Sequence, residues 1–332
     1  MIQPHLSLVT LVYNQAPFLE ERIRSIQAQT YQDFEWIVID DCSNDNSTEI
    51  LQQQLTGLPQ LKRLILHDKN QGVHPSFNEA LSWCEGEYVH HAAGDDSCLP
   101  ELFEKSVAFL NAHPGAGFVH TAYKITDLND RIKRTIYPLQ ETCLQSGSEV
   151  FRRLALQGNF ICSPSVTFHR RRYGSVGGMS NEWVYAGDYE LWMKLSVRYD
   201  VGYIAEPLVQ WRRMPQAISK RGAVSPQGAT EVYRVLKKVF AELPSDRHDL
   251  KCLYEPAVRH VSTLSMPAKA LWWLFVRHDT RMAGQMLKEA SRYDPGVWRS
   301  PSSYVAVLRE LLPRALRKLL KKGGGSTDFL PR

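Results

Sequence analysis

The sequence predicts an α/β fold in which a mostly parallel central sheet is flanked by helices. Short apolar, β-branched segments alternate along the first third of the chain with segments whose apolar residues recur at helical spacing. Two of the apolar segments end in paired carboxylates, as is typical of strands whose carboxyl ends form a ligand site. A largely helical pattern over 226–322 predicts a helical C-terminal extension.

The first strand and the first helix show the two patterns most clearly. Residues 6–12 are almost continuously apolar or β-branched, as expected of a strand that is buried on both faces. Between 18 and 29, Leu19, Ile23 and Ile26 recur at intervals of four and three and therefore share one helix face. Equivalent patterns predict strands at 35–39, 64–66, 88–92 and 117–121 and helices at 47–55, 75–85, 100–112 and 187–199.

The chain has 332 residues and a formal net charge of +5, and this excess is unevenly distributed. Residues 1–268 hold 27 basic and 30 acidic side chains, whereas 269–332 hold 13 and 5. We do not expect a nucleic-acid-binding body, because tracking phosphates requires cations clustered over the fold itself. No apolar stretch approaches the roughly 20 residues of a membrane-spanning helix.

The six cysteines form no C-x-x-C pair and no zinc-like spacing. We expect free thiols that pack as small apolar residues in a reducing compartment. The N-terminal residues lack the basic and apolar regions of a secretory signal. These features predict a cytoplasmic location.

Asp95 and Asp96, which follow the predicted strand 88–92, form the first candidate site. Adjacent carboxylates suit a hard cation such as Mg²⁺ or Mn²⁺, and that cation would neutralise charge on a departing nucleoside diphosphate. A solvated turn is the ordinary alternative for two neighbouring aspartates.

Asp41 and Asp188 are the other candidate carboxylates. Asp41 follows the strand 35–39, where it can accept a hydrogen bond from a base N–H or a ribose hydroxyl. Asp188 opens the helix 187–199, and its functional interpretation is a general base that takes a proton from an attacking hydroxyl. Helix capping is the alternative for Asp188, and it is the preferred interpretation for Asp45.

Five segments taken together resemble family 2 of the inverting glycosyltransferases. They are Ser7–Asn14, Val38–Ser47, Asn70–Gly72 with Asn78–Leu81, Gly86–Tyr88 with Gly94–Asp96, and the turn Gly177-Gly178 with the later Gly187–Trp192. The segments occur in the family's order and spacing over roughly residues 6–215. The resemblance implies a GT-A fold, which is Rossmann-like, and a UDP- or dTDP-sugar donor.

The resemblance also implies roles for the matching residues on the donor side. Tyr13 would pack on the base of the donor, and Asp41 would contact its uracil or thymine ring. The donor-binding residues implied in this way are Tyr13, Asn14, Asp41, Asn78, Asp95 and Arg212.

The remaining implied roles concern the metal, the catalytic base and the acceptor. Asp95 and Asp96 match the metal-binding motif, with Asp96 nearest to Mn²⁺ or Mg²⁺. Asp188 matches the catalytic base that activates the acceptor hydroxyl for direct attack with inversion. Gly178 and Trp183 match the acceptor side.

Three positions depart from the family pattern. Cys42 stands where glycine is usual, and Gly187 replaces the usual acid before Asp188, which leaves Asp188 as the sole base candidate in its motif. Met214-Pro215 stands where the family often has a histidine beside the diphosphate or the metal. Arg212 and Arg213 remain candidates for phosphate binding, with a surface ion pair as the alternative for Arg212.

The predicted function is that of a non-processive inverting glycosyltransferase acting on a saccharide or lipid-linked saccharide. Its expected setting is bacterial cell-surface glycan synthesis, such as LPS O-antigen, capsule or exopolysaccharide. The Q-x-x-R-W motif and the membrane spans of processive synthases are missing. A metal-dependent nucleotidyl or phosphoryl transferase and a non-catalytic nucleotide-binding scaffold stay open as alternatives, whereas a dehydrogenase lacks the required G-x-G-x-x-G.

The expected organisation is a GT-A domain over 1–220, a helical region over 221–322 and a flexible tail over 323–332. Leucines between 308 and 320 form one apolar helical stripe, and cations occupy the other faces. This pattern predicts peripheral docking of 306–322 on an anionic membrane surface, at the cytoplasmic face of the inner membrane. Packing of the stripe against the body or a partner subunit is the alternative, and the oligomeric state stays open.

Overall fold

The computed structural model describes residues 5–214, 222, 225–275 and 277–299. The chain divides into two units, and each is described by itself. The first unit comprises 1–150 and 160–214, and the second comprises 151–159 and 215–332. The predicted boundary at residue 220 falls within 215–221, outside the described residues.

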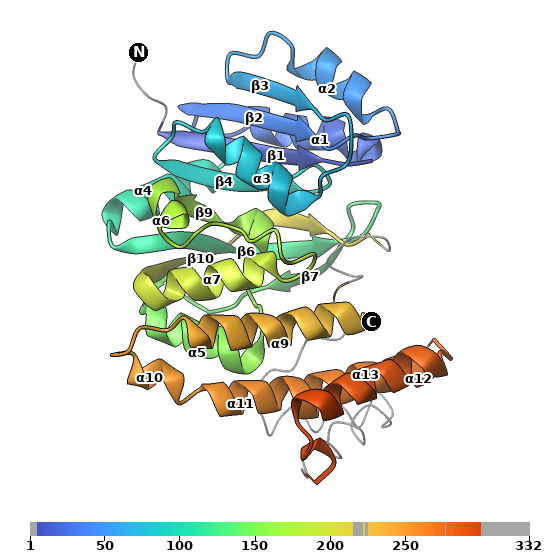
Figure 1. The fold of residues 1–332 in the computed structure, drawn as a ribbon. Coiled ribbons are helices and arrows are strands. Elements are labelled where there is room, and N and C mark those ends of the chain that lie inside the picture. Colours follow the sequence, from blue (N-terminus) through green and yellow to red (C-terminus); the bar gives the residue numbers. More distant parts are fainter. Residues whose placement is uncertain (1–4, 215–221, 223–224, 276, 300–332) are drawn as a thin grey trace. The chain divides into compact units, whose positions relative to one another are not determined.

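The first unit is built on a mixed sheet whose first half is parallel. Its strands lie in the order β3, β2, β1, β4, as Figure 1 shows from the top downward. All three pairings in this half are parallel, as predicted. The four strands are β1 (Leu6–Val12), β2 (Phe34–Asp40), β3 (Leu61–Leu66) and β4 (Tyr88–Ala93).

The second half of the sheet differs from the simple parallel order that the sequence suggests. The predicted strand at 117–121 is present within β6, but β9 lies antiparallel between it and β4. Strand β9 has only three residues, too few to show any periodicity in the sequence. The order continues through β10, which is parallel to β6, to β5. These strands are β5 (Ser97–Cys98), β6 (Ala116–Thr126), β7 (Ile132–Ile136), β8 (Cys143–Gln145), β9 (Thr167–His169) and β10 (Asp200–Arg212).

The helices of the first unit cover the sheet with the faces that the sequence predicts. Leu19, Ile23 and Ile26 of the first helix are at most 2% exposed and belong to the core. Figure 1 draws α3 and α7 in front of the strands. The helices are α1 (Ala16–Gln27), α2 (Ser47–Leu55), α3 (Val73–Ser82), α4 (Leu102–Ala112), α6 (Arg170–Ser175) and α7 (Gly187–Arg198), with a short 3₁₀ turn at Ser163–Ser165.

Adjacent histidines in β4 fill the two faces of the sheet. His90 contacts the ring of Phe103, and His91 contacts that of Phe77, with ring centroids 5.2 and 4.6 Å apart. Burial lowers the pKa of His91 to about 4, so its ring is neutral at pH 7. In the described part of the chain, no group of three or more His, Cys, Asp or Glu side chains is arranged to hold a metal. The six cysteines are free thiols, as expected.

The second unit is helical in its described part. Helix α5 (Gly147–Gln157) contributes its residues from 151 onward to this unit. The other elements are α9 (Pro226–Ala241), α10 (His248–Lys251), α11 (Tyr254–Arg259), a π-helical turn (His260–Ser265), α12 (Met266–Phe275), α13 (Thr280–Tyr293) and a 3₁₀ turn (Val297–Arg299). Among the described helices, none is both long and apolar enough to cross a membrane. The predicted basic helix at 306–322 and the tail at 323–332 lie outside the described residues.

Candidate active site

The carboxyl ends of β2, β1 and β4 meet at one edge of the sheet. Val12 lies opposite Asp40, and Leu11 lies opposite Ala93. Beyond the strands, the backbone N–H of Asp41 donates to Val12 at 2.9 Å, and that of Gly94 donates to Leu11 at 3.1 Å. The two acidic segments predicted at strand ends are therefore neighbours of the segment that follows β1.

Asn14 ties the end of β1 to the loop after β2. Its side-chain oxygen accepts the N–H of Asn44 at 2.7 Å, and its own N–H donates to the Ser43 hydroxyl at 2.9 Å. Asn14 adopts a positive φ of 54°, which asparagine tolerates better than most residues. The neighbouring Tyr13 is 46% exposed, so its ring is open to a ligand. Donor binding by both residues stays a prediction.

Cys42 occupies a left-handed backbone position in the same loop, with a φ of 64°. Its thiol donates to the carbonyl of Asp68 at 3.5 Å, a weak contact. The conformation explains why glycine suits this position, since a β-carbon costs about 1–2 kcal/mol in left-handed helical geometry.

We expect Cys42→Gly to stabilise the protein by up to about 1 kcal/mol, because the lost strain exceeds the entropy that glycine adds to the unfolded chain. The measurement is the denaturant midpoint of the purified chain. Cys42→Ala is the control, since it removes the thiol and keeps the β-carbon, and it should show no gain. A less stable glycine variant would contradict the assignment of strain to this residue.

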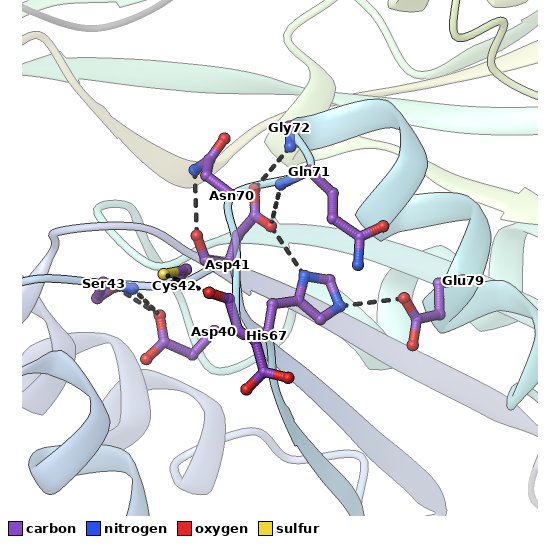
Figure 2. A network of polar contacts seen from close by, with 10 residues as sticks. Asp40, Asp41, Cys42, Ser43, His67, Asn70, Gln71, Gly72 and Glu79 are labelled. Atoms are coloured by element: carbon purple, nitrogen blue, oxygen red, sulfur yellow. Dashed lines mark hydrogen bonds and ion pairs between the residues drawn. The ribbon is translucent and has the colours of Figure 1, made fainter.

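The paired aspartates at the end of β2 face different partners. Asp40 accepts hydrogen bonds from the backbone N–H and hydroxyl of Ser43 and from the hydroxyl of Thr48, so it fixes the turn into α2. Asp41 accepts the N–H groups of Gln71 and Gly72, each at 2.8 Å. Figure 2 shows that His67 also approaches the Asp41 carboxylate.

The paired aspartates after β4 lie in a buried turn. Asp95 is 9% exposed and Asp96 is 2% exposed. The Asp96 carboxylate accepts the backbone N–H of Arg212 at 2.9 Å, because β5 pairs with β10 and brings the two segments together. Burial raises the pKa of Asp95, and burial together with the Asp95 charge raises the pKa of Asp96 well above its usual range. Two buried carboxylates that repel one another favour a bound cation.

Arg212 is paired within the protein. Its guanidinium contacts the carboxylates of Glu21, at 2.5 Å, and Asp130, and donates to the backbone oxygen of Asp95 at 2.8 Å. It is 2% exposed and packs over the ring of Phe18. In this conformation Arg212 stabilises the acidic turn through its hydrogen bond to the backbone of Asp95. Phosphate binding by Arg212 stays a prediction.

Arg213 has a different environment from Arg212. Its guanidinium packs over the ring of Trp211, 4.6 Å from the centroid. Burial lowers the pKa of Arg213, and the neighbouring Tyr123 and Cys162 oppose that effect. Among the described residues, no carboxylate forms an ion pair with Arg213. Both arginines are predicted phosphate ligands, but they differ in the structure, because Arg212 is already paired with Glu21 and Asp130.

Asp188 lies at the start of α7, where its carboxylate is half-buried. Its Oδ2 accepts the hydroxyl of Ser163 at 2.7 Å, and its Oδ1 accepts the N–H of Tyr189 at 2.6 Å. Cys162, next to Ser163, connects Asp188 with the acidic turn. Burial raises the pKa of the Cys162 thiol, and the charges of Asp96 and Asp188 raise it further. The 3₁₀ turn Ser163–Ser165 contacts both β4 and β10, so the hydrogen bond from Ser163 joins Asp188 to the strands next to the acidic turn.

Gly187 is required by the ring of His74. A β-carbon at this position would lie 2.4 Å from Cε1 of His74. The ring is held there because its Nδ1 lies 2.8 Å from the backbone oxygen of Trp183. His74 therefore takes the space that a side chain before Asp188 would need, which accounts for the glycine at this point.

We expect Gly187→Ala to destabilise the protein by about 1–3 kcal/mol, the usual cost of overpacking a buried site. Thermal unfolding of the full chain checks this. Gly174→Ala is the matched control, because nothing lies within 4 Å of a β-carbon there. If both variants have the melting temperature of the parent chain, His74 does not constrain residue 187.

The predicted acceptor-side residues lie in a segment that is hydrogen-bonded to Asn78 of α3. The Asn78 amide donates to the backbone oxygen of Met179 at 2.8 Å and accepts the Tyr173 hydroxyl at 2.7 Å. Gly178 has a φ of 65°, and a β-carbon there would meet the Tyr173 ring at 2.6 Å. Trp183 is 3% exposed, and its indole N–H donates to Glu190 at 2.7 Å. The observed contacts of Asn78 and Trp183 are structural, and their ligand contacts stay predictions.

Comparison with known proteins identifies the family. The model of the family described as glycosyl transferase family 2 matches residues 7–173, slightly more than half of the chain. The chain is 34% identical over 124 residues to a Bacillus subtilis (strain 168) protein named as glycosyltransferase EpsE, covering 37% of this chain and 45% of EpsE. It is 26% identical over 271 residues to the amylovoran biosynthesis glycosyltransferase AmsE of Erwinia amylovora, covering 81% of this chain and 96% of AmsE. Several of the curated relatives match over only about half of their own length.

Solved structures share the fold at low sequence identity. The structure of S. aureus TarS 1–349 in complex with UDP matches with a TM-score of 0.65 and 18% identity, over 96% of this chain and 92% of TarS. The mannosyltransferase PcManGT from Pyrobaculum calidifontis, solved with GDP-Man and Mn²⁺, matches with a TM-score of 0.57 and 16% identity, over 95% and 89% of the two chains. The fold expected from the sequence is confirmed: this chain has the GT-A fold and belongs to glycosyl transferase family 2.

Proposed function

We propose that this chain transfers a sugar from a UDP- or dTDP-sugar to a hydroxyl of a saccharide or lipid-linked saccharide, with inversion and one addition at a time. The observation that carries the proposal is the placement of carboxylates at one edge of the sheet. Asp41 follows β2 and Asp95-Asp96 follow β4, the two strands that flank β1. Asp188 accepts a hydrogen bond from Ser163, in a 3₁₀ turn that contacts β4. In the proposed reaction Asp41 contacts the base of the donor, Asp95 and Asp96 hold the cation at the diphosphate, and Asp188 meets the acceptor hydroxyl.

Asp188 is the proposed general base. Its contacts with Ser163 and with the N–H of Tyr189 fix the carboxylate at the start of α7, where the helix dipole favours the anion. From this position it takes the proton of the acceptor hydroxyl as the oxygen attacks the anomeric carbon. Direct attack from the face opposite the leaving diphosphate inverts the configuration and needs no nucleophilic side chain.

Asp95 and Asp96 are the proposed ligands for Mn²⁺ or Mg²⁺. Their oxygen donors suit a hard cation, and their burial as neighbouring anions leaves charge that a cation would offset. A bound cation would supply charge neutralisation for the departing nucleoside diphosphate. Arg213, which directly follows β10 and lacks a carboxylate partner among the described residues, is the cation of this chain that we assign to the same phosphates.

A thermal-shift panel of nucleotide sugars, with and without Mn²⁺, tests the donor class. A ligand at about 100 times its dissociation constant adds roughly 2.7 kcal/mol, which gives a clear shift. We expect UDP- or dTDP-sugars to raise the melting temperature in the presence of Mn²⁺. No shift with any nucleotide sugar would contradict the proposal and would favour a scaffold without donor binding.

The proposed setting is the synthesis of a bacterial surface glycan. The match to AmsE, named for amylovoran biosynthesis, covers nearly all of that protein and supports this setting. Transfer of labelled sugar to lipid extracts, compared with transfer to free oligosaccharides, distinguishes a lipid-linked acceptor from a soluble one.

We further propose that 306–322 docks the enzyme on an anionic membrane, because its sequence joins an apolar leucine stripe to a basic face. The full chain is expected to float with liposomes that contain anionic lipid, and a chain lacking 306–332 should remain in solution. Neutral liposomes are the control, since basic residues contribute about 1 kcal/mol each only near an anionic surface. Equal flotation of the two chains would reject the docking.

A further inference from the structure

Next to Asp41, which is predicted to contact the nucleotide base of the donor, a histidine ring lies between two carboxylates. His67 follows β3, and its backbone N–H continues the sheet by donating to Asp40 at 2.9 Å. Its side chain is 4% exposed. Nδ1 lies 2.8 Å from Oδ1 of Asp41, and Nε2 lies 3.0 Å from Oε2 of Glu79 in α3. Figure 2 shows the ring bridging these two carboxylates.

The two partners of His67 determine which way its hydrogen bonds run. An ionised carboxylate only accepts, whereas a neutral imidazole has one donor and one acceptor nitrogen. The contact with Asp41 is a hydrogen bond when the proton of the ring is on Nδ1. His67 is therefore a donor to Asp41, and Glu79 holds it in that orientation.

The Asp41 carboxylate is nearly saturated by donors from its own chain. His67 Nδ1 and the N–H of Gln71 donate to Oδ1, and the N–H of Gly72 donates to Oδ2, all at 2.8 Å. A carboxylate offers about four lone-pair positions. The donors of the described residues therefore leave one position free, on Oδ2.

A single remaining acceptor distinguishes among nucleotide bases. Uracil and thymine each present one imide N–H, at N3. Guanine presents two adjacent donors, N1–H and the 2-amino group, which match a carboxylate with both oxygens available. Cytosine and adenine each offer an amino N–H, but the adjacent ring nitrogen, N3 or N1, is unprotonated and repels a carboxylate. The shared fold does not decide this point, because the similar structures hold UDP in one case and GDP-Man in another.

We propose that His67 is a positioning residue that sets base specificity, because it fills Oδ1 of Asp41 and leaves one acceptor for the imide N–H of uracil or thymine. This inference rests on the proposed function, in which Asp41 meets the donor base. Guanine would leave one donor unpaired at this carboxylate, and an unpaired buried donor weakens binding by about tenfold or more.

The proposal is tested by measuring how tightly the full chain, with Mn²⁺, binds nucleoside diphosphates whose bases present different N–H donors. The probes are UDP, GDP and inosine diphosphate, which has N1–H and lacks the 2-amino group of GDP. We expect UDP to bind most tightly and inosine diphosphate to bind about tenfold more tightly than GDP. This comparison needs no variant, so it stands even if substitutions at His67 unfold the protein.

Three substitutions separate a specificity role from a merely structural one. His67→Leu frees a lone pair on Oδ1 and should bring the affinities for inosine diphosphate and GDP to within about twofold of each other. His67→Asn restores a donor at the place of Nδ1 and should recover the preference of the parent chain. His113→Leu is the matched control, since the ring of His113 hydrogen-bonds to the backbone oxygen of Phe109 in α4 and to no carboxylate of the described residues, and it should leave all ratios unchanged.

The outcomes distinguish this inference from the proposed function. If UDP binds and His67→Leu weakens all three ligands equally, His67 is structural and the specificity role is wrong. A parent chain that binds GDP as tightly as inosine diphosphate would reject it as well. If the parent chain binds none of the three ligands, the proposed function fails and the inference fails with it.

Discussion

Replacing Asp188 with asparagine should reduce sugar transfer by about 10²–10⁴-fold, the range that a positioned general base contributes. Asparagine keeps the shape of the side chain and can still accept the Ser163 hydroxyl through its amide oxygen, so α7 should begin as before. It loses the ability to take a proton, and its amide nitrogen no longer accepts the N–H of Tyr189. The affinity for the donor should stay within about threefold of the parent value, because Asp188 meets the acceptor in this mechanism.

The measurement is single-turnover transfer at saturating nucleotide sugar, combined with donor binding followed by thermal shift. Asp33→Asn is the matched control, since Asp33 is an exposed carboxylate next to β2, and it should transfer at the parent rate. An Asp188→Asn variant with full activity would contradict the mechanism. It would favour a nucleotidyl or phosphoryl transferase, which uses the metal carboxylates and has no need of this base.

The parts of the fold that the sequence predicts are those with a strong local pattern. Helix α2 spans Ser47–Leu55, the range expected from its apolar residues, and β1 matches its apolar run. Strand β9 could not be predicted, because its three residues form a strand only through pairing with β4 and β6. Long-range pairing of this kind leaves no periodic trace in a short segment.

The acidic residues of the site were predictable for a related reason. Asp41, Asp95 and Asp96 each follow an apolar strand, so the rule for parallel sheets places them at one edge. His67 and His74 were missed as site residues, because each acts through a contact that is distant in sequence. His67 contacts Asp41, and the ring of His74 fills the space that a β-carbon at Gly187 would need. The glycine at 187 was the available signal for His74, because a missing side chain marks a close approach.

Asp96 should control both the stability of the metal-free protein and its response to Mn²⁺. The carboxylate is 2% exposed and lies beside Asp95, so without a cation it is a buried charge next to a like charge. Asp96→Asn removes that charge, and its amide oxygen can still accept the N–H of Arg212. We expect the metal-free variant to melt above the metal-free parent chain.

The pH dependence follows from the direction of the shift. Burial raises the pKa of folded Asp96 above that of the unfolded chain, so between these two values the folded state binds more protons. The stability of the metal-free parent chain should therefore fall as the pH rises from about 4 through the raised pKa of folded Asp96. Asp96→Asn should reduce this loss, so the difference between the two melting temperatures should widen over the same interval.

Adding Mn²⁺ should reverse the order of the two proteins. At about 100 times the dissociation constant a bound cation adds roughly 2.7 kcal/mol to the stability of the parent protein, or about 4 °C in melting temperature for cooperative unfolding of a chain of this size. The Asp96→Asn variant should show little shift, whereas Asp33→Asn should respond as the parent does. A full Mn²⁺ shift in Asp96→Asn would place the cation elsewhere. A variant that is less stable than the parent without metal would mean that the Asp96 charge is already compensated within the protein by the buried cations Arg22 and Arg212, both of which act to lower the pKa of Asp96.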